Sequence, residues 1–168
     1  MVDYDEQQDY FSDGDLATPE NLPEGSRCIG KVTKASFTDR EIGDNGPQIE
    51  LEIVAVGFED GTKFDVEKNY YLTGRLPFWS RGEYAINSRR ALARLVAVVT
   101  GKDEEEIKTT PVRDNVNALV GGYVTFDVKW RKFETKDEDP ETGKKIIAIS
   151  QDFKKIKAAT AEQVAGVV

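Results

Sequence analysis

The chain has 168 residues, of which 39% are hydrophobic and 32% charged, a balance that suits one folded domain with a sizeable core. It contains no histidine and a single cysteine, Cys28, which excludes an internal disulfide and the commonest hydrolase and zinc-enzyme sites. No apolar run reaches the length of about 18 residues that a membrane helix needs, and the first residues do not resemble a signal peptide. We therefore expect neither membrane insertion nor export.

The formal net charge of −8 is concentrated at the N-terminus. Residues 1–25 contain eight acids and no lysine or arginine, so the remaining 23 acids and 23 cations make residues 26–168 formally neutral. The same segment carries Tyr4, Tyr10 and Phe11, has no apolar periodicity and is rich in turn-forming residues. We expect a flexible acidic arm over residues 1–25, a folded domain over 26–157 and a flexible tail over 158–168.

Five segments have the composition of β-strands. The second is the clearest, because Ile49, Leu51 and Ile53 alternate with Glu50 and Glu52, as in a half-buried strand. Short turns are expected between the first and second, second and third, and fourth and fifth strands. The expected strands are residues 28–37, 48–57, 63–73, 123–133 and 144–156.

One helix is expected between the third and fourth strands. Leu92, Leu95 and Val99 recur at helical spacing, Ser88 is a suitable N-cap and Gly101 is placed to end the helix. Residues 102–107 and 112–119 are candidates for further short helical turns, the first with Asp103 as its cap. Residues 74–87 are expected to be irregular.

Five strands with a helix between the third and fourth are typical of the OB-fold, a partly open five-stranded barrel that binds oligonucleotides and oligosaccharides. The fold expected is therefore mainly β, an OB-like antiparallel barrel with an acidic N-terminal arm. An open antiparallel sheet that carries one helix has the same element order and is the alternative.

The segment from Lys129 to Phe133 is the strongest candidate binding surface. Since Val124 and Val128 supply the inner face of this strand, Lys129, Arg131 and Phe133 should share its outer face, with Trp130 between them. Single-stranded nucleic acid needs cations for its phosphates and flat rings for its bases. The alternative is a solvated hairpin end in which Trp130 closes the core.

A second basic and aromatic segment runs from residue 70 to 84. Tyr71 has outward parity, and arginine can both stack on bases and pair with phosphate, which favours Arg75 and Arg81 as contacts. Trp79 is a candidate contact too, although a Pro-Phe-Trp sequence also suits a plug that seals a barrel end. Lys34 and Arg40 are weaker candidate phosphate contacts.

No catalytic or metal site is predicted, and no cofactor. Cys28 lies in an expected strand and has no histidine to activate it, so it is interpreted as a small buried residue. The acids of residues 103–106 are interpreted as the solvated start of a helix.

The chain resembles small bacteriophage proteins encoded near replication and recombination genes, a group that includes OB-fold single-stranded DNA-binding proteins. The likeness lies in residues 21–25, the strand 49–56, the helix with Leu92 and Leu95, and the segment Val120–Val128 that opens a hairpin with an acidic turn. Such proteins commonly end in an acidic C-terminal tail, whereas here the acidic segment is N-terminal. If that role carries over, residues 3–11 either mimic DNA or recruit replication or recombination proteins; a solubilising leader is the alternative.

The function expected is sequence-independent binding of single-stranded DNA, without catalysis, in support of phage replication or recombination in the bacterial host cytoplasm. A homo-oligomer is compatible with the apolar tail. The main alternative is a phage protein-binding module, for host takeover or anti-defence, that uses the acidic aromatic arm. A virion structural role comes third.

Overall fold

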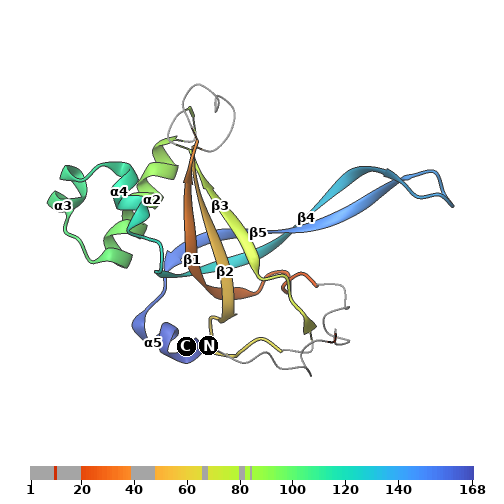
Figure 1. The fold of residues 1–168 in the computed structure, drawn as a ribbon, viewed down its shortest axis with the longest axis horizontal. Helices are drawn as coiled ribbons and strands as arrows, with labels where there is room; N and C mark the ends of the chain where they lie inside the picture. The colour runs from red at the N-terminus through yellow and green to blue at the C-terminus, as the bar shows by residue number, and fades with distance from the viewer. Residues whose placement is uncertain (1–9, 11–19, 39–47, 66–67, 80–81, 84) are drawn as a thin grey trace.

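A computed structural model of the chain describes residues 10, 20–38, 48–65, 68–79, 82–83 and 85–168. Five strands form one antiparallel sheet in the order β3-β2-β1-β4-β5, and one longer and two short helices of the described chain lie between β3 and β4 (Figure 1). The fold is therefore mainly β. The strands are β1 (Arg27–Phe37), β2 (Ile49–Phe58), β3 (Thr73–Phe78), β4 (Tyr123–Glu138) and β5 (Lys145–Ala158). The helices are α2 (Ala85–Thr100), α3 (Glu104–Thr109), α4 (Val112–Asn117) and α5 (Ala161–Val167).

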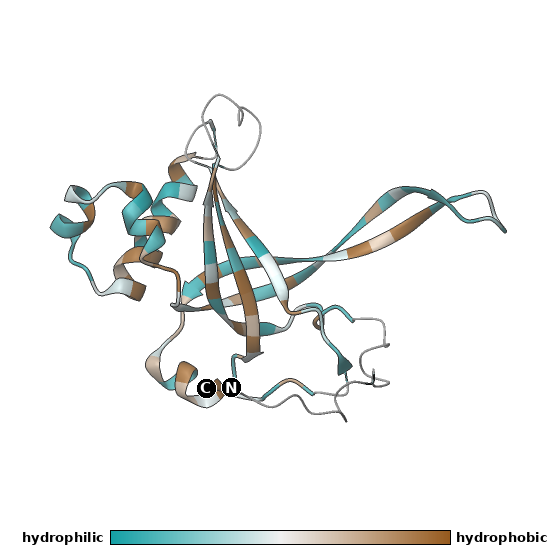
Figure 2. Ribbon diagram, in the orientation of Figure 1, coloured by the Kyte–Doolittle hydropathy of each residue, from teal (hydrophilic) through white to brown (hydrophobic). Residues whose placement is uncertain are grey.

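Alternation decides which face of the sheet is buried. In β2 the side chains of Ile49, Leu51 and Ile53 are buried, while Glu50 and Glu52 on the other face are partly exposed, as expected from the sequence. Every strand contributes buried hydrophobic residues to the core. Figure 2 shows hydrophobic segments in brown along the sheet. The core also includes Leu22, which lies before β1 and is fully buried.

The third strand differs from its expected position. It runs from Thr73 to Phe78, and none of the described residues from 62 to 72 belongs to a named strand. Asn69 has a φ of 47°, a left-handed conformation that interrupts an extended chain. The connection from β2 to β3 is therefore long rather than a tight hairpin.

The two edge strands, β3 and β5, approach each other closely at one point. A Cβ atom at Gly74 of β3 would overlap the ring of Phe153 in β5, so glycine is what allows the close packing there. Phe153 is buried and stacks on Phe126 of β4, with ring centroids 4.0 Å apart. The open sheet thus curls until its edges meet around a shared aromatic pair.

The helix α2 begins three residues earlier than Ser88, the expected cap. Ser88 lies inside the helix, and its Oγ accepts a hydrogen bond from the backbone N–H of Trp79 (2.8 Å). The helix buries Leu92, Leu95 and Val96, and it ends at Thr100, directly before Gly101, which has a φ of +70°.

Two short helices follow α2, and another closes the chain. The side chain of Asp103 caps α3 by accepting a hydrogen bond from the N–H of Glu106 (2.8 Å), as the sequence predicts. The C-terminal residues, expected as a flexible tail, include α5, which starts with a capping box between Thr160 and Gln163. Within the described residues, no helix is long and apolar enough to cross a bilayer.

The hairpin of β4 and β5 is longer than expected. Pairing continues from Val124 with Ala158 out to Glu138 with Lys145, so the two strands project well beyond the rest of the sheet (Figure 1). The helices α2, α3 and α4 lie on the opposite side of the molecule from this projection.

Candidate nucleic-acid interface

The outer face of the β4–β5 hairpin carries three of the predicted contacts. Lys129, Arg131 and Phe133 pair in register with Asp152, Ser150 and Ala148, so they share one face of the hairpin. All three are exposed, and the Phe133 ring is 46% exposed. The parity assigned to these residues from the sequence is confirmed.

Positive charge concentrates where the hairpin leaves the sheet. We call residues 127–133 and 150–157 the hairpin base; it contains six lysines and arginines and two aspartates, a formal charge of +4. Both aspartates are engaged. Asp127 accepts a hydrogen bond from Arg27 (2.7 Å) and lies 3.9 Å from Lys155, and Asp152 lies 3.6 Å from Arg131.

Four cations of the hairpin base have no ion-pair partner among the described residues: Lys129, Lys132, Lys154 and Lys157. Each of their side chains is exposed. An exposed cation without a carboxylate neighbour is available to a phosphate without first giving up another interaction. The hairpin base therefore provides four exposed positive charges, with Lys129 on its outer face and Lys132 on the face of Trp130.

Trp130 lies on the other face of the hairpin. Its indole Nε1–H donates a hydrogen bond to the backbone carbonyl of Leu22 (2.7 Å), and the residue is 37% exposed. The bond fixes the ring against the segment that precedes β1. Trp130 is therefore held beside Leu22, a core residue, and leaves part of its surface accessible.

Gln151 joins that segment to Tyr71. Its Oε1 accepts a hydrogen bond from the N–H of Leu22 (2.8 Å), and its Nε2 donates to the carbonyl of Tyr71 (2.5 Å). Tyr71 in turn donates its backbone N–H to Glu20 (2.7 Å) and leaves its side chain 54% exposed. Tyr71 and Trp130, which are far apart in sequence, are thus tied to the same three-residue segment beside the hairpin base.

The outer face of β1, β2 and β3 is less favourable for an anion. Lys34 lies opposite Glu52, which lies opposite Arg75, so these two predicted contacts flank a carboxylate. Arg75 also forms an ion pair with Glu50 (3.2 Å). This face alternates in sign and does not extend the positive charge of the hairpin base.

The remaining predicted contacts are separate or undescribed. Trp79 follows β3 and lines a cavity beside α2, while the neighbouring Phe78 is buried and seals the core. Arg40 and Arg81, like the expected arm residues Tyr4 and Phe11, lie outside the described residues.

Sequence reasoning included Lys132 in its candidate segment without naming it as a contact, and it missed Lys154, Lys157 and the link from Gln151 to Tyr71. The expected strand ended at Phe133, and a charged turn was expected over residues 137–143. The signal that could have extended it was on the partner strand, where Ile146, Ile147 and Ile149 favour a long β-strand up to the hairpin end. Figure 2 shows this hydrophobic stretch along the projecting hairpin.

Cys28 does not provide a nucleophile. Burial raises the pKa of its thiol to about 11, an effect that a hydrogen bond with Ser26 only partly opposes. A reactive cysteine needs the opposite shift, toward the thiolate at neutral pH.

Comparison of the chain with protein families and with curated proteins finds no match.

Proposed function

We propose that the chain binds single-stranded DNA through the hairpin base, without sequence specificity and without catalysing a reaction. The observation that carries this proposal is the set of four exposed lysines in the hairpin base, which have no ion-pair partner among the described residues, together with the exposed aromatic rings nearby. Phosphates would lie along Lys129, Lys132, Lys154 and Lys157, and bases would stack on Phe133 and Tyr71. Each base–ring stack contributes roughly 1–3 kcal/mol and tolerates any base.

The order of the strands supports the same proposal. In an OB-fold, β1 pairs with both β2 and β4, and the connection between strands four and five is one of the loops that bind oligonucleotides. Here β1 lies between β2 and β4, and β3 meets β5 at Gly74. We propose that the sheet is an OB-like barrel whose fourth and fifth strands extend into the binding element.

The predicted contacts differ in the strength that we assign to them. To bind a phosphate, Arg131 must give up its ion pair with Asp152, and Arg75 must give up its ion pair with Glu50. Each arginine should therefore contribute less binding free energy than a lysine without an ion pair among the described residues. Trp130 is held by its bond to Leu22 and offers only part of its ring. We also propose, from the resemblance, a role in phage replication or recombination in the host cytoplasm, with self-association as a further feature.

A salt titration tests the binding proposal. Labelled single-stranded and duplex DNA are titrated with the full chain at several salt concentrations. The expected result is a preference for single strands, with log K falling linearly against log salt by about 0.7 for each phosphate neutralised. The variant Lys129→Ala/Lys132→Ala/Lys154→Ala should lower that slope by about 2.

A matched control removes the same charge elsewhere. The variant Lys63→Ala/Lys68→Ala/Arg94→Ala has the same net charge but alters exposed positions away from the hairpin base. It should bind almost as the unmodified chain does. Equal losses in the two variants would mean that only net charge matters, and absence of binding at low salt would overturn the proposal in favour of a protein-binding module.

A further inference from the structure

One face of the β4–β5 hairpin continues outward from the core. Val128 and Phe153 lie opposite each other in the ladder, and both are buried in the core. Pairing is regular from this row to Glu134, so every second row along the hairpin shares the same face. The next rows on this face are Trp130 with Gln151, Lys132 with Ile149, and Glu134 with Ile147. We call the last two of these the outer rows.

The outer rows expose apolar surface. Ile149 is 43% exposed and Ile147 is 61% exposed. The segment before β1 reaches the row nearer the core, where Leu22 bonds to both Trp130 and Gln151, so the outer rows lie beyond that contact. An isolated two-stranded hairpin is only marginally stable in water, and packing against its apolar face stabilises it. The outer rows therefore favour a protein partner.

The outer rows also carry one charge of each sign. Lys132 and Glu134 are both exposed, and neither has an ion pair among the described residues. Each row thus joins one charge on β4 to one isoleucine on β5. A second hairpin laid on this face and turned end for end would place its Glu134 opposite Lys132. Its Ile147 would then lie opposite Ile149, so the pattern is complementary to itself.

We propose that two copies of the chain associate through the outer rows of their hairpins, in antiparallel orientation. The two-fold axis would lie between the two faces, parallel to the hydrogen bonds of the ladder and midway between the outer rows. This orientation brings the base of each hairpin toward the outer end of the other. The base has a formal charge of +4, and residues 134–149, with five acids and three lysines, have a formal charge of −2, so the two regions attract.

This association is compatible with DNA on the other face of the hairpin. Lys129 and Lys154 lie on the face opposite to the outer rows. Lys132 is the proposed DNA contact that the two surfaces would share, and an exposed ion pair is weak enough to be exchanged for a phosphate. The proposal names the surface for the self-association proposed above, and it does not depend on DNA binding.

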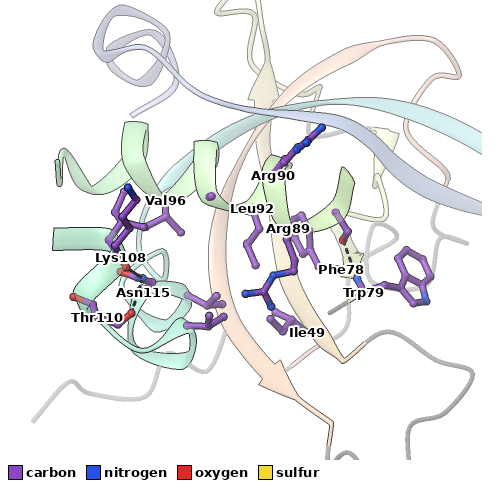
Figure 3. Close-up of a pocket in the computed structure, with 15 residues that line it drawn as sticks. Ile49, Phe78, Trp79, Arg89, Arg90, Leu92, Val96, Lys108, Thr110 and Asn115 are labelled. Atoms are coloured by element: carbon purple, nitrogen blue, oxygen red, sulfur yellow. Dashed lines mark hydrogen bonds between the residues drawn. The ribbon is translucent and has the colours of Figure 1, made fainter. Parts of the chain in front are cut away.

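The cavity beside α2 is less suitable for the same purpose (Figure 3). It has a volume of about 380 Å³ and a mostly apolar wall, but the charged residues that line it are all cations: Arg89, Arg90 and Lys108. A two-fold interface brings the same patch of both copies together, so like charges would meet there. The outer rows of the hairpin avoid this repulsion because each contact joins opposite charges.

Sedimentation of the full chain over a range of concentrations tests the association. The mass of the unmodified chain should rise from that of one chain toward that of two as the concentration increases. Lys132→Glu places a carboxylate opposite Glu134, and Glu134→Lys places an ammonium group opposite Lys132. Because the axis repeats each contact, either substitution changes two pairs and should raise the dissociation constant about tenfold. An unmodified chain that stays monomeric at every concentration would overturn the proposal.

An equimolar mixture of these two variants tests the pairing itself. In a mixed dimer both contacts again join opposite charges, so the mixture should associate about as strongly as the unmodified chain. The exchanged variant Lys132→Glu/Glu134→Lys restores both pairs within one sequence and should do the same. If neither the mixture nor the exchanged variant associates more strongly than the single variants, the assigned contact is wrong.

Lys129→Glu provides the matched control. It changes the net charge by the same amount as Lys132→Glu and lies on the same strand, but on the opposite face. It should therefore associate as the unmodified chain does, and thermal unfolding checks that each variant is folded. Equal losses in Lys129→Glu and Lys132→Glu would assign the effect to net charge and overturn the proposal. DNA binding is measured separately, so a monomeric chain that binds DNA would overturn the association alone.

Discussion

Cys28 shows how burial fixes the chemistry of one side chain. It lies in β1 with no exposed surface, and its thiol has a pKa raised to about 11 from an ordinary value of 9.0, with desolvation as the main cause. In the unfolded chain the thiol is hydrated and titrates near its ordinary value. The folded state therefore disfavours the thiolate relative to the unfolded state.

The sign of this difference predicts a pH dependence. The stabilisation of the folded state that results from the raised pKa is on the order of 2 kcal/mol. It is fully present below pH 9 and is lost as the pH rises toward 11. Urea denaturation of the unmodified chain and of Cys28→Ala at pH 8 and pH 10.5 measures it. The alanine variant should lose less stability between the two pH values; an identical loss in both proteins would assign the effect to other groups.

At the scale of elements, Gln151 holds the segment before β1 against the hairpin base. Its side chain bonds both to Leu22 and to Tyr71. The variant Gln151→Leu keeps a similar size but removes both bonds and leaves the N–H of Leu22 without an acceptor, at a cost of about 1–3 kcal/mol. Hydrogen exchange at the Leu22 amide should become faster in this variant.

A neighbouring residue on the same strand provides the comparison. Ser150 has a buried Oγ without a hydrogen-bond partner among the described residues, so Ser150→Ala removes no bond. In the Ser150→Ala variant, the Leu22 amide should exchange at the same rate as in the unmodified chain. Equal acceleration in both variants would show that any change in β5 loosens this segment, and that Gln151 has no special role.

The elements with strong local patterns could be predicted from the sequence, and those fixed by distant contacts could not. The alternation of β2 and the spacing of Leu92 and Leu95 depend only on local periodicity. The start of β3 instead depends on Gly74, whose lack of a side chain makes room for Phe153 from the other end of the chain. The candidate site was predictable to the same extent. The sequence pattern could place Lys129 and Arg131 on one face of the strand, but it could not predict the hydrogen bond between Tyr71 and Gln151.

For the whole molecule, the buried Leu22 determines where the N-terminal segment can be removed. Residues 20–22 bond to Tyr71, Gln151 and Trp130, and Leu22 belongs to the core. Removal of residues 1–19 should leave the free energy of unfolding nearly unchanged. Removal of residues 1–24 should lower it by about 2–5 kcal/mol, the usual cost of losing a buried leucine side chain.

Denaturant titration of the two truncated chains measures this difference. A large decrease in the free energy of unfolding after removal of residues 1–19 would mean that these residues contribute to stability. The comparison also bears on DNA binding, because only the shorter truncation removes acids without disturbing the segment beside the hairpin base. Tighter DNA binding by that form would indicate competition from the acidic residues.

The projecting hairpin separates charge along its length. Its base carries a formal charge of +4, while residues 134–149 at its outer end contain five acids and three lysines. The two regions lie on the order of 30 Å apart, which gives the hairpin a large electric dipole moment. In the electric field of a polyanion this dipole experiences a torque that turns the positive base toward the polyanion and the negative tip away from it. The protein is therefore oriented before the two surfaces touch.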